Sequence, residues 1–357
     1  MVKMKDRVEK LRLEMARASV DCFLVTEPAN IFYFSGFTGD DGLLLITEQN
    51  KYVITDARFE LQLKKQAGTW QHVITRNYLQ AACELVAKEK LVALGFEAQL
   101  PYWQYDYLDE NLTSDLVALP NLLEKIRSVK DRDEIAKIKA ACKLAGQGYD
   151  YLLTKFQQST QWTERQLATE LDYFMKSNGA SDKSFETIVA SGLRTAWPHG
   201  TASDKLVKKG DLITLDYGYY LNGYTSDVTR TFAYGSQPAE VRTIYQVVDE
   251  ARALTIQAVK AGVSGKELDR IGRDFISQAG YGEFFNHGMG HGIGLSIHEL
   301  PNVGARYDDV LQAGQVITIE PGIYLPNIGG VRIEDDILVT EAGYEILTNF
   351  GRNYQEL

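Results

Sequence analysis

The stretch of this chain that decides its fold reads LITLDYGYYLNGYTSDVTR over residues 212–230. An Asn-Gly pair at its centre separates two runs of β-forming residues, and this combination is the strongest short signal of a β-hairpin. With that pair as the turn, Asp216 faces Thr229, and Asp227 lies on the same face, diagonal to Asp216. Diagonal neighbours lie about 7–8 Å apart, within reach of a shared ion. The alternative is two solvated aspartates on a hairpin surface, but the apolar run before Asp216 argues against it.

A glycine-rich segment, HGMGHGIGLSIHE, occupies residues 287–299 and holds three of the five histidines of the chain. The spacing of its first two histidines is that of helical zinc sites, but glycine at alternate positions opposes a helix, so we reject that interpretation. Such glycines allow the backbone to approach a ligand or another strand closely. His291 and His298 are seven positions apart and would point to opposite sides of an ideal strand. The pattern therefore predicts different roles for them unless a bulge intervenes.

Two glutamates end apolar runs, Glu320 after VITI at 316–319 and Glu334 after GGVRI at 329–333. A buried carboxylate without a partner raises its pKa and becomes neutral. A salt bridge to Arg332 is the simpler explanation, but one arginine cannot neutralise four buried acids. With the two aspartates and the glycine-flanked histidine, the set comprises four carboxylates and one imidazole, whose charge two divalent cations would balance. The pattern predicts a two-metal hydrolase.

Composition and charge narrow the class of protein. A chain of 357 residues is long for one hydrophobic core, so two domains are expected. The net charge of −10 argues against a nucleic-acid-binding surface. Residues 1–18 alternate charged and apolar side chains as an amphipathic helix does, unlike a secretion signal, and no run approaches the roughly 20 apolar residues of a membrane span. Three widely spaced cysteines favour free thiols, so we expect a cytoplasmic protein without nucleic-acid or membrane partners.

Helix and strand patterns divide the chain in two. The first third alternates both periodicities, as expected of a small α/β domain, and the charged segment 124–134 follows it. We therefore predict domains at 1–124 and 125–357. The second domain reads as α+β, with strands and hairpins after Phe185 and a capping box that begins a helix at Thr163. The predicted strands are 22–26, 43–46, 52–54 and 91–96, and the predicted helices are 57–66, 79–88, 131–156, 239–261 and 265–279.

Several motifs in the second domain resemble those of the proline-specific metallopeptidases of the pita-bread fold. These are the Xaa-Pro aminopeptidases and Xaa-Pro dipeptidases, whose relatives include methionine aminopeptidase and creatinase. The segments IFYFSGFTG and ITDARF of the first domain resemble the creatinase-type amino-terminal domain, although Ala57 and Phe59 replace the more usual glycine and tyrosine. Methionine aminopeptidases lack this domain. The resemblance implies an α+β pita-bread catalytic domain after a smaller α/β domain. The motifs are FETIVASG (185–192), PHG (198–200), LDYG (215–218), TSDVTRT (225–231), GHGIG (290–294), IEPGIY (319–324) and VRIED (331–335).

The resemblance also implies roles for individual residues. Five would bind two metal ions, with Asp227 and Glu334 bridging both ions. Glu320 would also move a proton, while His199 and His298 would contact the peptide carbonyl and stabilise the tetrahedral intermediate. His287, Tyr324 and Arg332 would bind substrate or support the ligands. Trp197, Tyr217 and Tyr324 are candidates for the wall of a proline pocket, and a role as ordinary core aromatics is at least as well supported. The implied metal ligands are Asp216, Asp227, His291, Glu320 and Glu334.

The favoured function is therefore a two-metal Xaa-Pro aminopeptidase, which releases the residue before a proline. The alternative is an Xaa-Pro dipeptidase restricted to dipeptides. A creatinase-like hydrolase and a non-catalytic peptide-binding module rank lower, because both typically lack the complete ligand set that is present here. Oxygen-rich ligands favour Mn(II), with Co(II) or Zn(II) as alternatives. Proline-containing peptides are the expected substrates, and the family resemblance implies a homodimer.

Overall fold

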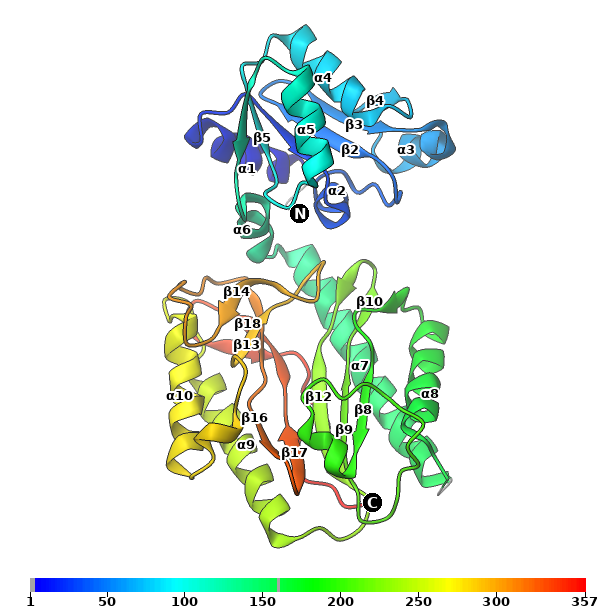
Figure 1. The fold of residues 1–357 in the computed structure, drawn as a ribbon, viewed down its shortest axis with the longest axis vertical. Helices are drawn as coiled ribbons and strands as arrows, with labels where there is room; N and C mark the ends of the chain where they lie inside the picture. The colour runs from blue at the N-terminus through cyan, green and yellow to red at the C-terminus, as the bar shows by residue number, and fades with distance from the viewer. Residues whose placement is uncertain (1–3, 159–160) are drawn as a thin grey trace. The chain divides into compact units, whose positions relative to one another are not determined.

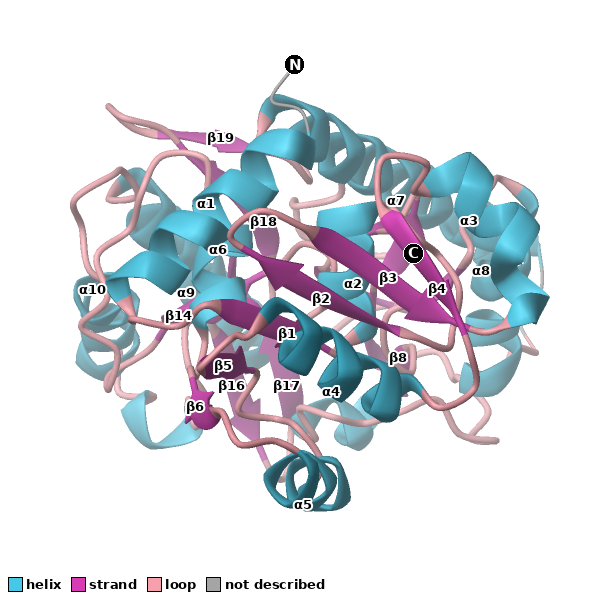
Figure 2. Cartoon of the chain, turned by 90° about the horizontal axis from the view of Figure 1, so that it is seen from above, coloured by secondary structure: helices cyan, strands magenta, loops and turns pink. Residues whose placement is uncertain are grey.

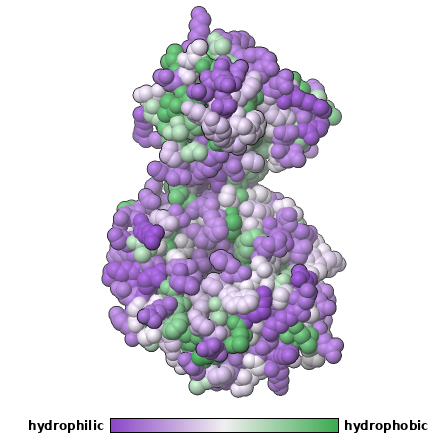
Figure 3. Space-filling model, viewed as in Figure 1, coloured by the Kyte–Doolittle hydropathy of each residue, from purple (hydrophilic) through white to green (hydrophobic). Residues whose placement is uncertain are grey.

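The computed structural model describes residues 4–158 and 161–357. The chain divides into two compact units, Met1–Arg127 and Ser128–Leu357. The expected boundary near residue 124 falls inside helix α6 (Leu122–Ser128), the last residue of which begins the second unit. Within the described residues, no helix combines the length and the apolar character needed to cross a bilayer. On the face drawn in Figure 3, apolar residues form small separate groups among hydrophilic ones.

The first unit is built on a twisted sheet whose described strands lie in the order β4-β3-β2-β1-β5-β6. β2 runs antiparallel to both neighbours, whereas the other adjacent pairs are parallel. Helices α4 and α5 lie over one face of this sheet (Figure 2), where Cys83, Val86 and Leu108 pack on side chains of β1 to β3 and β5. The elements are α1 (Met4–Arg17), β1 (Cys22–Val25), α2 (Pro28–Ser35), β2 (Leu43–Thr47), β3 (Lys51–Thr55), a 3-10 helix (Ala57–Phe59), α3 (Glu60–Gln66), β4 (Gln71–Ile74), α4 (Tyr78–Glu89), β5 (Ala93–Phe96), α5 (Tyr102–Asn111) and β6 (Asp115–Ala118).

The second unit consists of two halves, each with a pair of helices packed outside β-structure (Figure 1). In the first half, α7 and α8 cover the sheet β12-β9-β8. In the second half, α9 and α10 pack against the sheet β14-β13-β15-β18-β19 and the pair β16-β17. The helices are α7 (Arg132–Gln158), α8 (Glu164–Ser177), α9 (Ala239–Gln257) and α10 (Gly265–Gln278). The strands are β7 (Asp182–Lys183), β8 (Ile188–Ser191), β9 (Leu212–Tyr217), β10 (Tyr219–Leu221), β11 (Tyr224–Thr225), β12 (Val228–Ala233), β13 (Gly290–Gly292), β14 (Glu299–Val303), β15 (Val316–Ile319), β16 (Gly322–Leu325), β17 (Gly329–Arg332), β18 (Asp335–Val339) and β19 (Tyr344–Ile346).

Local sequence signals explain how the first half begins. The capping box before α8 is present: the Thr163 hydroxyl accepts from the Gln166 N–H, and the Gln166 side chain accepts from the Thr163 N–H. The predicted hairpin is also confirmed, because Asn222 and Gly223 both adopt positive φ, at 54° and 82°, as a type I′ turn requires. Asp216 pairs with Thr229 across β9 and β12, in the predicted register. The apolar α7/α8 core and this register fix which face of the hairpin carries its aspartates.

Candidate active site

A cavity of about 410 Å³ lies between the two halves of the second unit. All five predicted metal ligands line it, and so do His199, His287, His298 and Arg332. Tyr324 lies behind this lining, hydrogen-bonded to two of these residues. The cavity is lined by Phe185, Ile188, Pro198, His199, Asp216, Asp227, His287, Gly288, Gly290, His291, Ile297, His298, Asn302, Val303, Tyr307, Glu320, Arg332 and Glu334.

Each half of the unit supplies part of the predicted ligand set. Asp216 lies near the end of β9, and Asp227 directly precedes β12, so both come from the hairpin of the first half. His291 is the middle residue of β13, Glu320 directly follows β15, and Glu334 lies between β17 and β18, all in the second half. The site therefore forms only where the two sheets meet, and the cores beneath each pair of helices hold the ligands on strand ends.

Three of these side chains converge closely. Ligand atoms of Asp227, His291 and Glu334 all lie within 4.8 Å of one another. His291 Nε2 is 3.6 Å from Asp227 Oδ2 and 3.5 Å from Glu320 Oε1. The His291 Nδ1 lies 3.1 Å from the Gly292 carbonyl oxygen, to which its N–H donates, so Nε2 directs a lone pair toward the carboxylates. Burial lowers the pKa of His291 and keeps the ring neutral. A lone pair facing carboxylate oxygens is the arrangement that a bound cation requires.

The electrostatics of the carboxylates also fit bound cations. Burial raises the pKa of Asp227 and Glu334 well above the usual range, and neighbouring carboxylates add to both shifts. Burial raises the pKa of Glu320 as well. Asp216 Oδ1 is shielded from solvent and has no hydrogen-bond partner in the described residues. Divalent cations would restore the charged form of these groups and give the Asp216 oxygen a partner, so the residues present fit a metal centre.

A chain of hydrogen bonds supports the predicted ligands from behind. Arg332 Nη2 donates to Asp216 Oδ2 at 2.5 Å, and Nε donates to the Thr229 hydroxyl at 3.0 Å. That hydroxyl donates in turn to Glu334 Oε2 at 2.7 Å. Arg332 and Thr229 therefore connect an aspartate of one half to a glutamate of the other. The supporting role expected for Arg332 agrees with this geometry. Thr229 was missed, although the hairpin register placed it opposite Asp216.

Tyr324 and His287 continue this chain. Arg332 Nη1 lies 2.8 Å from the Tyr324 hydroxyl, which lies 2.8 Å from His287 Nε2. The His287 Nδ1 is 2.8 Å from the Gly288 carbonyl oxygen and donates its proton there, so Nε2 accepts from the Tyr324 hydroxyl. Burial lowers the pKa of His287, in agreement with a neutral ring. The structure thus brings Tyr324 and His287 together with Arg332.

His291 and His298 do not lie on opposite sides of one ideal strand, because an interruption of the strand, the exception that the prediction allowed, is present. Their rings lie with centroids 4.4 Å apart and both border the cavity. The segment between them is not an extended strand: β13 ends at Gly292, the chain reverses, and β14 begins at Glu299. The register also shifts between His291 and Gly292. Period-two alternation stops at the reversal, so both imidazoles reach the same space.

The aromatic residues considered for the cavity wall have different positions. Tyr217 is completely buried in the core beneath α7 and α8, and its hydroxyl donates to the Ala145 carbonyl oxygen at 2.7 Å. It therefore takes the core role. Trp197 is 59% exposed and is not part of the cavity lining, whereas the exposed His199 two positions later is. Phe185, Ile188 and the other apolar lining residues form the actual wall.

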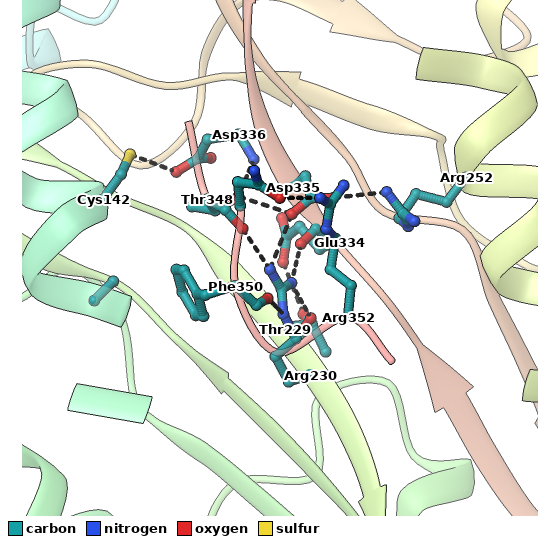
Figure 4. Close-up of polar contacts among 12 residues, drawn as sticks. Cys142, Thr229, Arg230, Arg252, Glu334, Asp335, Asp336, Thr348, Phe350 and Arg352 are labelled. Atoms are coloured by element: carbon teal, nitrogen blue, oxygen red, sulfur yellow. Dashed lines mark hydrogen bonds and ion pairs between the residues drawn. The ribbon is translucent and has the colours of Figure 1, made fainter. Parts of the chain in front are cut away.

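A buried charged network lies behind Glu334 (Figure 4). Arg230 uses all five of its N–H groups within the described structure: it donates to the carbonyl oxygens of Thr229, Glu334, Thr348 and Phe350 and to the Asp335 carboxylate. Arg252 donates to the other oxygen of Asp335 at 2.8 Å. The network therefore holds the backbone of Thr229 and of Glu334, the two residues joined by the hydrogen bond between the hairpin and the glutamate. The sequence did not predict this network, because arginine and aspartate side chains usually lie on the protein surface.

Asp336 supports a predicted ligand through the backbone. Its Oδ2 accepts the Asp227 N–H at 3.0 Å and the Cys142 thiol at 3.3 Å (Figure 4). Burial raises the pKa of Asp336 to about 7. The carboxyl therefore links helix α7 to the residue expected to bridge both metals.

Family comparisons agree with this fold and site. The model of the Creatinase/Prolidase N-terminal domain matches residues 7–129, and that of Metallopeptidase family M24 matches residues 136–341. The chain belongs to metallopeptidase family M24 and has its pita-bread catalytic domain. The expected fold class, family and peptidase activity are confirmed.

Individual relatives cover nearly the whole chain. An Xaa-Pro dipeptidase of Pyrococcus furiosus is 37% identical over 350 residues, which are 98% of this chain and 99% of that protein. The structure of an Xaa-Pro dipeptidase from Bacillus anthracis has a TM-score of 0.96 at 39% identity, with 99% and 100% of the two chains covered. The structure of an X-Pro aminopeptidase from Thermotoga maritima has a TM-score of 0.89 at 36% identity, with 96% and 100% covered. Two of these three relatives are thus Xaa-Pro dipeptidases and one is an X-Pro aminopeptidase.

Proposed function

We propose that this protein is a two-metal Xaa-Pro peptidase and that its main activity is that of an Xaa-Pro dipeptidase. The observation that carries the metal site is the convergence of Asp227, His291 and Glu334, with Glu320 3.5 Å from the imidazole, in one cavity. The dipeptidases of Pyrococcus furiosus and Bacillus anthracis support the choice of substrate. The Thermotoga maritima relative supports the second candidate, an Xaa-Pro aminopeptidase.

Five residues would hold the metal ions: Asp216, Asp227, His291, Glu320 and Glu334. Bound divalent cations would supply Lewis acidity, which polarises the scissile carbonyl and makes a water molecule more acidic. Four carboxylates and one imidazole form an oxygen-rich set, which favours Mn(II) over metals that prefer thiolates. Arg332 and Thr229 hold Asp216 and Glu334 in place through their hydrogen bonds.

The remaining lining residues would act on the substrate. Glu320 borders the cavity, and its Oε1 lies 3.5 Å from His291 Nε2, so its carboxylate would take a proton from water and return it to the leaving nitrogen. His298 and His199 would donate to the carbonyl oxygen as negative charge develops on it. The Xaa-Pro bond has no N–H, and the ring restrains the backbone before it. The apolar wall that includes Phe185 and Ile188 offers the pyrrolidine ring a complementary surface.

Hydrolysis of defined peptides tests this proposal. Protein stripped of metal and reloaded with Mn(II) is given Ala-Pro, Ala-Pro-Ala and, as a control for proline specificity, Ala-Ala. Cleavage of Ala-Pro alone supports the dipeptidase, and cleavage of Ala-Pro-Ala makes the protein an aminopeptidase. If Mn(II), Co(II) and Zn(II) all fail to restore cleavage of either proline peptide, the peptidase proposal fails. The homodimer and the cytoplasmic location stay predictions, which sedimentation and cell fractionation would check.

A further inference from the structure

A second cavity lies wholly within the first unit. Its volume is about 560 Å³, compared with about 410 Å³ for the candidate active site. Volumes of this size hold small-molecule ligands in other proteins. Nothing in the proposed peptidase chemistry uses this cavity. It is lined by Thr26, Asp41, Gly42, Leu43, Arg76, Asn77, Tyr78, Leu79, Gln80, Trp103, Gln104 and Tyr107.

The cavity lies at the edge of the sheet where β1 and β4 end and β2 begins. Thr26 directly follows β1 and Arg76 follows β4, so both mark carboxyl ends of parallel strands. Gly42 directly precedes β2, which runs in the opposite direction and so begins at the same edge. Strands β2, β3 and β4 follow β1 in the chain and lie on one side of it in the sheet. Helix α4 then connects β4 to β5, which lies on the other side of β1. Open α/β sheets bind ligands beside the carboxyl ends of strands, where the chain reverses its order in this way.

One wall of the cavity is suited to an anion. The lining includes Arg76, which is exposed and makes no hydrogen bond or ion pair in the described part of the chain. Beside it begins the 12-residue helix α4, whose first turn contains no acidic residue and whose Asn77 side chain forms no cap. The first N–H groups of a helix have no partner within the helix and carry partial positive charge. Asn77 to Gln80 all line the cavity.

The wall formed by α5 is aromatic. Trp103 is 64% exposed and lines the cavity together with Tyr107. A planar ring of a ligand would stack on this exposed indole.

The acidic residue of the lining is ion-paired with Arg58 and not with Arg76. Asp41 is 2.7 Å from the Arg58 guanidinium, which also contacts Asp56 at 2.7 Å. These residues line an adjoining polar cavity of about 340 Å³ that shares Asp41, Arg76 and Tyr78 with the larger one. Arg58 hydrogen bonds lower the pKa of Asp56 to about 2, so the ion-paired cluster stays charged. Asp41 therefore has a guanidinium partner, whereas Arg76 makes no ion pair in the described part of the chain and is available to an anion.

We propose that this cavity binds a small organic anion with a planar ring, so that the anionic group contacts Arg76 and the start of α4 and the ring packs on Trp103. Phosphate and carboxylate share the required chemistry at the anionic end. The proposal does not depend on the activity of the second unit.

Calorimetric titration of the full-length, Mn(II)-loaded protein tests the site. The probes are adenosine monophosphate and indole-3-acetate, which combine a planar ring with a phosphate or a carboxylate, and adenosine and inorganic phosphate, which carry one feature each. We expect at least one combined probe to bind about tenfold or more tightly than both single-feature probes. The combined probe that binds identifies the anionic group. If neither combined probe binds, or if inorganic phosphate binds as tightly, the proposal is overturned.

Variants then locate the binding. Arg76→Gln is expected to weaken the combined probe about tenfold or more, and Trp103→Leu to remove its advantage over inorganic phosphate. Arg17→Gln is the matched control, because Arg17 is an exposed arginine of the same unit outside the cavity lining. Equal affinity in Arg76→Gln and Arg17→Gln would overturn the assignment. Both replaced side chains of the cavity are exposed, so thermal unfolding should change little and confirms that each variant is folded.

Discussion

Replacement of Thr229 by valine should weaken metal binding without changing the shape of the core. The side chain is completely buried. Its hydroxyl accepts a hydrogen bond from Arg332 Nε at 3.0 Å and donates one to Glu334 Oε2 at 2.7 Å. Valine has nearly the same shape but neither bond. Loss of a hydrogen-bond partner behind a metal ligand typically costs 10–100-fold in affinity, so we expect a loss of about this size for Mn(II). That range equals about 1.4–2.7 kcal/mol of binding free energy. The unmatched Arg332 N–H should also lower stability by about 1–3 kcal/mol.

The assay is calorimetric titration of metal-stripped protein with Mn(II), with urea unfolding measured in parallel. Thr229→Ser is the matched control, because it keeps the hydroxyl and removes the methyl group. We expect the serine variant to bind Mn(II) nearly as the parent protein does. The reasoning is refuted if Thr229→Val binds with parental affinity, because the hydroxyl would then not orient Glu334. It is also refuted if serine and valine weaken binding equally, since packing of the methyl group would then be the cause.

Three further predictions follow from the same site. Glu320→Gln should lower Ala-Pro hydrolysis by about 100-fold or more while the protein stays folded by circular dichroism, and undiminished turnover would rule out its role in proton transfer. In metal-stripped protein, burial raises the pKa of Asp336 from 3.8 to about 7, so its contribution to stability is complete at acidic pH and is lost as the pH rises from about 4 to 7. Melting temperatures measured across that window should show this loss. Asp336→Asn should make it smaller without abolishing it, because the raised pKa values of Asp227, Glu320 and Glu334 act in the same direction. Arg230→Met should cost about 3–5 kcal/mol in urea unfolding, because it removes the donor to several buried carbonyl oxygens and one guanidinium partner of the buried Asp335. The exposed pair of Arg242 with Glu356 serves as the control, and Arg242→Met should cost less than about 1 kcal/mol.

Much of the second unit could be predicted because its signals are local. The Asn-Gly turn determines the hairpin register, and that register alone places Asp216 opposite Thr229. Capping residues and apolar periodicity similarly located α8 and α10, which begin at Glu164 and Gly265. Four of the predicted ligands share a recognisable property, since each is a carboxylate in or next to a buried strand, whereas His291 is recognisable by the glycines on either side of it.

Other features depend on contacts that no local pattern records. β4 and β6 are short and only partly buried, so neither shows the apolar run of an inner strand, and neither was predicted. Helix α5 has only Leu108 fully buried and lacks a clear apolar stripe. The shared cavity of His291 and His298 follows from a chain reversal that period-two alternation cannot describe. The role of Arg230 requires partners more than 100 positions away.

The connection of Asp216 and Thr229 to the second half of the unit has a consequence for biosynthesis. Thr229 and Glu334 are 105 positions apart, and Asp216 and Arg332 are 116 apart. At about 5–20 residues per second, the ribosome completes the aspartate hairpin roughly 5–20 s before Glu334 is made. During that interval the emerging chain carries two carboxylates that have neither their arginine nor the other ligands. Metal capture therefore comes after synthesis of nearly the whole chain, and a nascent chain that stops before residue 334 would form the hairpin without acquiring the metal centre.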